Sequence, residues 1–171
     1  EAINSLSKAI RIEKSVKNLD FRAHLYSLTE DKTSQIHDLI SIINIYEAKN
    51  MGNDHMLKKT FFDLIPLLIK KEYSLEMTTE IWEKGISIFK EEYRFQSFQA
   101  GIQFSAGKLK EAYSTITTVL NTNEIMLEDD YTYNIAREIF KSLGKVKPYH
   151  KMTQKEINRL DEDTKRTARN L

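Results

Sequence analysis

Few residues of this chain have the types and spacing needed for covalent or metal chemistry. Cysteine is absent, so thiolate nucleophiles, thiolate metal sites and disulfides are excluded. The four histidines include no His-Glu-x-x-His motif and no pair at the spacing of a zinc site. His24 follows Asp20 by about one helical turn, but a surface hydrogen bond accounts for this pair better than a shared metal does. No Walker loop, GxGxxG or GxSxG motif is present. The sequence therefore predicts no enzyme, no metal site and no cofactor.

Two acidic clusters are the remaining candidates for acid–base chemistry. They are Glu91-Glu92 and Glu128-Asp129-Asp130. Carboxylates near the start of a helix are stabilised by the helix dipole, and both clusters lie beside an expected helix end. Helix capping is therefore a better interpretation of these carboxylates than a catalytic pair.

Basic residues are unevenly distributed, although the chain has 26 Lys and Arg against 25 Asp and Glu and a net charge of +1. One basic stripe is expected on the first helix, and a second basic stretch runs from Arg137 to Arg159. Such stripes can bind phosphates through counterion release, but they are also typical of a solvated helix face. Because the net charge is so small, any RNA contact is expected to be local or shared with a partner. The first stripe consists of Lys8, Arg11, Lys14 and Lys17.

The elements that position these residues are predicted to be helices. Only 5 Gly and 2 Pro are present, too few for the frequent turns of a sandwich or barrel. Apolar residues recur every three or four positions, the spacing of amphipathic helices. About eight short helices are expected, over 2–17, 21–28, from Thr33 or Ser34 to the turn at 50–54, 56–73, 75–92, 93–106, 109–120 and 131–143. Within these, Pro66 predicts a kink or two short helices, and Gly85 predicts a close helix contact.

Short loops between these helices favour antiparallel hairpins. The predicted fold is therefore an all-α stack of helical hairpins over residues 1–147. Residues 148–171 are expected to form a linker and a charged C-terminal helix, which begins at a capping box of Thr153 and Glu156. No apolar stretch approaches the roughly 18 residues that span a bilayer, so no membrane span is expected.

A repeat is visible in the second half of the chain. Gly107 and Gly144 lie 37 residues apart, and each is followed by Lys, an aliphatic residue and Lys. This period is within the range of helix-pair repeats. Gly52 is expected to mark an earlier hairpin.

Residues 95–147 resemble the pentatricopeptide repeat (PPR), in the degenerate form found in fungal mitochondrial proteins. The resemblance rests on the string Tyr131-Thr132-Tyr133-Asn134 at the start of one helix, and on the turn from Ala106 to Ala112. The tetratricopeptide repeat (TPR) shares the spacing from Gly to Ala in that turn. The period of 37 departs from the usual ~34 residues, and the usual end of the repeat is replaced by 124–130.

The PPR resemblance implies an α-solenoid that binds single-stranded RNA and acts in mitochondria on mRNA processing, stability or translation. The targeting segment of a mitochondrial protein is not present in this chain, and its absence indicates nothing about location; the alternative expectation is an intracellular location. In such repeats, side chains near the start of the first helix read bases. Carried over by position, the RNA-binding residues are Ser97, Thr132, Asn134, Arg137, Lys141, Lys145 and Lys147. The alternative is a TPR-like protein–protein scaffold, or a subunit of a larger assembly such as a mitochondrial translation complex.

Overall fold

The computed structural model describes residues 1–52, 54–70, 73–122 and 129–144. All regular secondary structure in these residues is helical, which confirms the predicted all-α class. The predicted helix over 153–169 and its capping box lie outside the described residues. The eight helices are α1 (Ala2–Ile12), α2 (Val16–Leu28), α3 (Lys32–Ala48), α4 (His55–Ile69), α5 (Leu75–Ile88), α6 (Tyr93–Ser105), α7 (Leu109–Thr122) and α8 (Asp130–Ser142).

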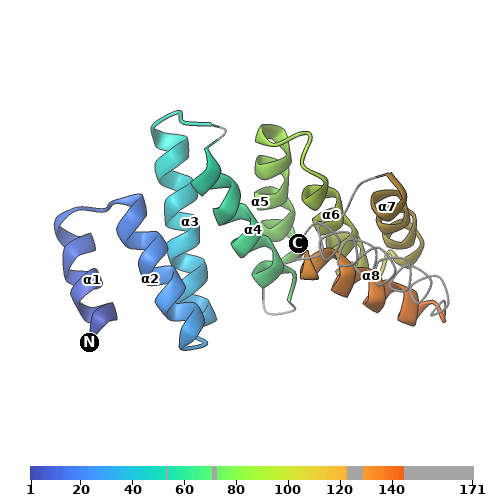
Figure 1. Ribbon diagram of the computed structural model, residues 1–171, viewed down its shortest axis with the longest axis horizontal. Coiled ribbons are helices and arrows are strands. Elements are labelled where there is room, and N and C mark those ends of the chain that lie inside the picture. Colours follow the sequence, from blue (N-terminus) through green and yellow to red (C-terminus); the bar gives the residue numbers. More distant parts are fainter. Residues whose placement is uncertain (53, 71–72, 123–128, 145–171) are drawn as a thin grey trace, which may run out of the picture.

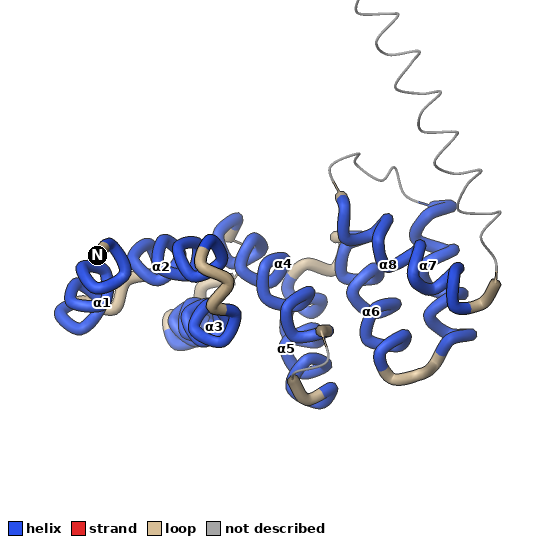
Figure 2. Tube along the Cα trace, turned by 90° about the horizontal axis from the view of Figure 1, so that it is seen from below, coloured by secondary structure: helices blue, strands red, loops and turns tan. Residues whose placement is uncertain are grey.

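The helices follow one another along the long axis of the molecule, with α1 at one end and α7 and α8 at the other (Figure 1). Each helix packs on the next along the chain. In addition, α6 packs on both α4 and α8, so that these three alternate helices form a row (Figure 2). The α6–α7 hairpin packs against α8 through both of its helices.

Most helices begin at a side chain that accepts a hydrogen bond from the first turn, as is typical of N-caps. Ser74 caps α5, and Asp129 caps α8, which confirms the capping role that the sequence predicts for the acidic cluster of Asp129. Ser15 caps α2 and Asp54 caps α4. The cap of α3 is Asp31 rather than Thr33 or Ser34, because its carboxylate reaches the backbone N–H of Ser34 at 3.1 Å.

Four helices end at a residue in the left-handed backbone region, two positions after the last helical residue. Gly107 and Gly144 do so with φ of +75° and +66°, which confirms that they lie at equivalent points after α6 and α8. Glu30 and Asn50 take the same conformation after α2 and α3. The prediction for Gly52 is wrong, since Asn50 is the residue that ends α3 in this way.

Several predicted helix boundaries differ from the structure: the helix predicted over 56–73 ends at Ile69, and the helix predicted over 75–92 ends at Ile88. The first helix ends at Ile12, and Ser15 starts a new helix at Val16, so no helix spans 2–17. Pro66 lies inside α4 without dividing it into two helices. The proline ring is accommodated within one continuous element, although it removes one backbone hydrogen bond.

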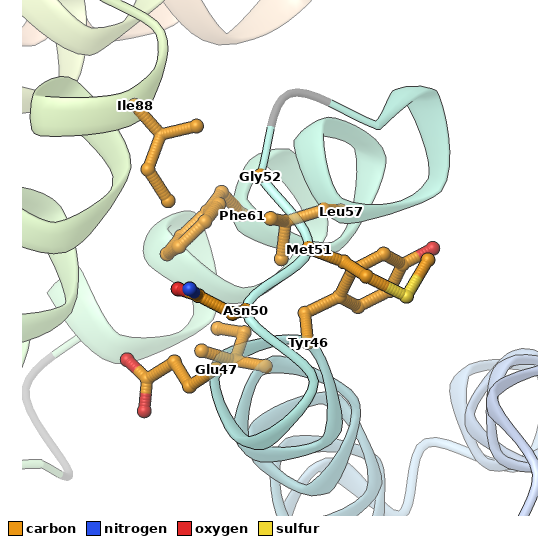
Figure 3. A pocket seen from close by; sticks show the side chains of 9 residues that line it. Tyr46, Glu47, Asn50, Met51, Gly52, Leu57, Phe61 and Ile88 are labelled. Carbon is orange, nitrogen blue, oxygen red and sulfur yellow. The ribbon is translucent and has the colours of Figure 1, made fainter.

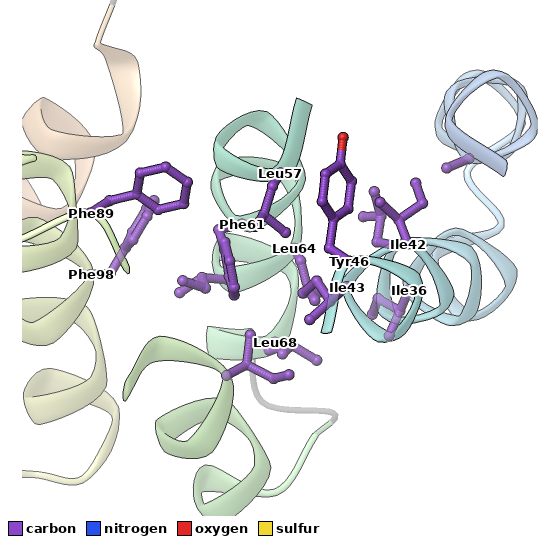
Figure 4. Close-up of a cluster of buried hydrophobic side chains, with 14 of the residues drawn as sticks. Ile36, Ile42, Ile43, Tyr46, Leu57, Phe61, Leu64, Leu68, Phe89 and Phe98 are labelled. Atoms are coloured by element: carbon purple, nitrogen blue, oxygen red, sulfur yellow. The ribbon is translucent and has the colours of Figure 1, made fainter. Parts of the chain in front are cut away.

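The main core fills the space between α2 and α6 (Figure 4). Rings of Phe61, Phe89, Phe95 and Phe98 pack together toward its α6 end, with neighbouring centroids 5.8–6.2 Å apart. A second core lies between α6, α7 and α8. Tyr131 joins the two, because its ring packs against residues of both.

A buried ion pair fixes the first three helices. The Arg22 guanidinium on α2 donates to both carboxylate oxygens of Asp38 on α3, at 2.7 and 2.6 Å. It also donates to Ser7 of α1 at 2.9 Å. Asp38 is only 1% exposed, and the two-pronged contact is the geometry that best compensates a buried carboxylate.

Candidate functional site

Two of the predicted RNA-binding hydroxyls are buried between α6 and α8. Ser97 and Thr132 are both 0% exposed, and their oxygens lie 2.8 Å apart. Thr132 is also 2.7 Å from the Asp129 carboxylate, which accepts but cannot donate. Thr132 therefore donates to Asp129, and Ser97 donates to Thr132. No base can reach either hydroxyl in this structure, and both serve to join the two helices.

Asn134 occupies the position of Ser97 one repeat later, but it is exposed. Ser97 is covered because α8 packs over that face of α6. No described helix covers the same face of α8. The equivalent positions Ala100 and Gly101, which are small and buried on α6, become Arg137 and Glu138 on α8, which are exposed. The outer face of α8 is thus polar where the same face of α6 is closely packed.

The predicted RNA-binding residues on this outer face form a stripe that we call the α8 stripe, consisting of Asn134, Arg137 and Lys141. All three are exposed. Arg137 donates a hydrogen bond of 3.4 Å to the Asn134 side chain. Glu138 lies among them and reduces the positive charge. Lys145 and Lys147 lie outside the described residues.

The predicted N-terminal stripe is divided by the end of α1. Lys8 and Arg11 lie on α1, Lys14 lies in the turn, and Lys17 lies on α2. All four side chains are exposed. This group lies at the opposite end of the molecule from α8 (Figure 1), so a single short RNA segment cannot bridge the two.

Between these ends, several cations are held by carboxylates. Lys58 pairs with Glu92 at 3.2 Å, and Arg94 pairs with Asp129 at 3.3 Å. Lys59 lies 2.9 Å from both Asp20 and Asp63, and Lys84 lies 3.0 Å from Glu47. The acidic clusters are therefore partly explained, since Glu92 and Asp129 precede α6 and α8 and each binds a cation two helices earlier, on α4 and α6. Asp129 also caps its helix, whereas the Glu92 side chain makes no cap hydrogen bond. The described residues show no continuous basic face along the row of α4, α6 and α8.

Aromatic side chains that could stack on bases are used for packing instead. The Trp82 indole N–H donates to the backbone oxygen of Phe95 at 2.7 Å and joins α5 to α6. Tyr131 is half-buried as a residue, but its hydroxyl is buried beside Gly101, and this burial raises the pKa of the phenol. Tyr113 packs edge-on against Phe140.

An apolar pocket opens between α3, α4 and α5 (Figure 3). It encloses about 210 Å³, and its apolar lining includes Ile43, Leu57, Phe61 and Ile88. Glu47, Asn50 and Met51 lie at its edge, where Met51 is 49% exposed. The backbone N–H of Met51 donates to the Tyr46 carbonyl at 3.0 Å, and Met51 and Gly52 both contribute to the pocket lining. Sequence reasoning did not find this pocket, because its walls come from three helices.

In the described part of the chain, no three His, Asp or Glu side chains converge on a point where a metal could bind. His24 and Asp20 line a polar cleft together, but Asp20 pairs with Lys59. The described helices include none with the length and apolar character to cross a membrane.

Comparison of the chain with family models, with curated proteins and with solved structures found no match.

Proposed function

We propose that this chain is a non-catalytic helical-repeat scaffold whose partner is a protein. The observation that carries this proposal is the apolar pocket between α3, α4 and α5 (Figure 3). Apolar cavities of about 150 Å³ lined by Leu, Ile and Phe bind benzene in other proteins, so a pocket of about 210 Å³ has room for one aromatic or aliphatic side chain. An anchor of this kind is typical of protein interfaces and carries much of their binding energy.

The pairing of the central cations supports the same proposal. Phosphate binding relies on cations that release counterions when they meet the RNA backbone. Lys58, Lys59 and Arg94 are already engaged with carboxylates of neighbouring helices. The centre of the molecule is thus better suited to a partner that binds through apolar contact and balanced charge.

The proposal is tested by NMR titration with N-acetyl-phenylalanine amide, which presents one aromatic side chain. Saturable shifts are expected at Ile43, Leu57 and Ile88. Ile88→Glu places a charge in the pocket lining and should abolish these shifts. Leu75→Glu on the same helix is the matched control, because Leu75 is 42% exposed and lies outside the lining. Absence of shifts in the folded wild-type protein would reject the pocket as an anchor site.

RNA binding at one end of the molecule is the second candidate, favoured by the exposed α8 stripe. In this candidate, Arg137 and Lys141 neutralise phosphates and Asn134 contacts a base, as the PPR resemblance implies. The protein would then act on mitochondrial mRNA. The small number of cations limits the contact to a short segment.

A salt titration of binding to single-stranded RNA tests the second candidate. Log K should fall linearly with log salt, with a slope of roughly 0.7 per phosphate contact. Lys141→Ala should lower the slope by about that amount, while the exposed Lys110→Ala on α7 should leave it unchanged. Absence of binding at low salt would eliminate this candidate.

A further inference from the structure

We infer that a polar cleft between α2 and α4 receives an arginine side chain of the partner protein. This inference rests on the proposed scaffold function and gives the partner a second contact, separate from the apolar pocket. The cleft encloses about 260 Å³. Its lining comes from three helices: Asp20, Ala23, His24 and Ser27 of α2, Gln35 and Leu39 of α3, and Lys59 and Asp63 of α4.

The cleft exists because the row of alternate helices is interrupted at this point. Helix α6 packs on α4, and α8 packs on α6, but α2 and α4 make at most sparse contact. Helix α3 packs on both α2 and α4 and lies behind the gap between them (Figure 2). Neighbouring helices of the row are in contact at α4–α6 and α6–α8, whereas a space remains open between α2 and α4.

The charges around the cleft favour a cationic guest. Asp20 and Asp63 share one lysine, because Lys59 lies 2.9 Å from each carboxylate. With His24 neutral, the lining carries two negative charges and one positive charge. Each carboxylate can accept about four hydrogen bonds, so one lysine leaves acceptor capacity on both. The side chains of Lys59 and Asp63 are 44% and 41% exposed, which leaves this capacity accessible from solvent.

The shape of the lining distinguishes arginine from other cations. Ala23 and Leu39 are 2% and 1% exposed, and they form an apolar floor beneath the carboxylates. An arginine side chain combines an aliphatic stem, which such a floor can cover, with a planar fork that matches carboxylate geometry. The two carboxylates would repel a phosphate, so RNA is a poor guest for this cleft.

The test is an NMR titration of the full chain at low ionic strength with N-acetyl-arginine amide. N-acetyl-citrulline amide is the control probe, because it keeps the shape of arginine without its charge. Saturable shifts are expected for Ala23, Gln35 and Leu39 with the arginine probe, and none with the citrulline probe. Asp63→Asn should weaken binding about two- to fivefold, the range expected for an exposed ion pair. Lys59→Met, which removes the competing cation, should strengthen binding by a similar factor.

Glu83→Gln is the matched control variant, since Glu83 is exposed on α5 away from the cleft and should leave binding unchanged. The inference is overturned if the arginine probe causes no shifts at the cleft, if citrulline binds equally well, or if Asp63→Asn has no effect. The scaffold proposal is read out separately, from the response of the apolar pocket to the phenylalanine probe. If the apolar pocket binds the phenylalanine probe but the cleft does not bind the arginine probe, only this inference is rejected.

Discussion

At the scale of single residues, close helix packing depends on the absence of a side chain at Gly85. A Cβ added to this residue of α5 would overlap the Phe95 ring of α6 and lie 3.2 Å from the Phe61 ring of α4. Both rings are fully buried, so neither can move aside freely. The structure confirms the close helix contact that the sequence predicts at Gly85. This contact lets α5 pack directly against the phenylalanine rings of the core.

Gly85→Ala should therefore destabilise the protein by about 1–3 kcal/mol, because an added methyl overpacks a filled core. Urea denaturation measures this change. Gly52→Ala is the control, since nothing lies within 4 Å of the added Cβ and Gly52 lacks a left-handed backbone. Equal stability of the two variants would contradict this account of Gly85.

The buried hydroxyl of Thr132 gives a second prediction at this scale. Thr132→Val keeps the shape but leaves Ser97 and Asp129 without their shared partner, at a cost of about 1–3 kcal/mol. The exposed Thr33→Val is the control in the same urea experiment. A change in RNA base preference without any loss of stability would instead return Thr132 to the base-reading role that the PPR resemblance implies.

At the scale of elements, acidic residues at three helix starts bind side chains of earlier helices. Asp54 precedes α4 and accepts a hydrogen bond of 2.7 Å from the Tyr46 hydroxyl of α3. Glu92 precedes α6 and binds Lys58 of α4, and Asp129 precedes α8 and binds Arg94 of α6. These acidic residues recur at nearly the repeat period. The last two contacts join alternate helices of the row, α4 to α6 and α6 to α8.

The cap at Asp54 predicts a pH dependence of stability. The Tyr46 hydroxyl, followed by the Met56 backbone N–H, lowers the pKa of the Asp54 carboxyl below its ordinary value of ~3.9. A lowered folded-state pKa means that this contribution is present above ~3.9 and disappears as the pH falls through the lowered value. The Asp54→Asn variant can still cap α4. It should be less stable than the wild-type protein at neutral pH, and this difference in stability should shrink in acid.

Urea midpoints measured from neutral to acidic pH test this prediction, with Glu83→Gln as the control. A difference between Asp54→Asn and wild type that stays constant across this range would show that ionisation of Asp54 does not contribute. Tyr46→Phe should reproduce part of the effect, because it removes the hydrogen bond that contributes most to the lowered pKa of Asp54.

At the scale of the whole molecule, stability is graded from the centre to the N-terminal end. Helix α1 has no buried residue and packs mainly on α2, whereas α4 has six buried residues and lies in the main core. Local opening is easiest where few apolar contacts hold an element. The molecule is therefore expected to open first at α1.

Native-state hydrogen exchange should show this gradient directly. Amides of α1 should exchange fastest among the described helices, and those of α4 and α6 should be the most protected. Deletion of residues 1–12 should change the urea midpoint less than any single core substitution in α4. Protection of α1 equal to that of α4 would show that α1 is held by contacts beyond those described.

The sequence by itself determined the features that depend on neighbours a few residues apart. The helical periodicity, the capping role of the acidic cluster at Asp129, and the equivalent glycines 107 and 144 follow from such local rules, and the structure confirms them. The sequence does not reveal the helix break at Ser15, because apolar residues keep a helical spacing from α1 into α2. This continuous spacing conceals the cap. The all-α class also follows from the sequence, because the spacing of apolar residues is helical and too few Gly and Pro are present for the turns of a sandwich or barrel.

Only the tertiary structure decided which of these helical residues are accessible. Ser97 and Asn134 hold the same repeat position, yet one is buried and the other exposed, because burial depends on whether another helix packs over that face. The apolar pocket, the cleft between α2 and α4, and the pairing of Lys59 with Asp20 join residues far apart along the chain. Periodicity gives the face of a helix on which a residue lies, but the packing of distant helices decides what that face meets.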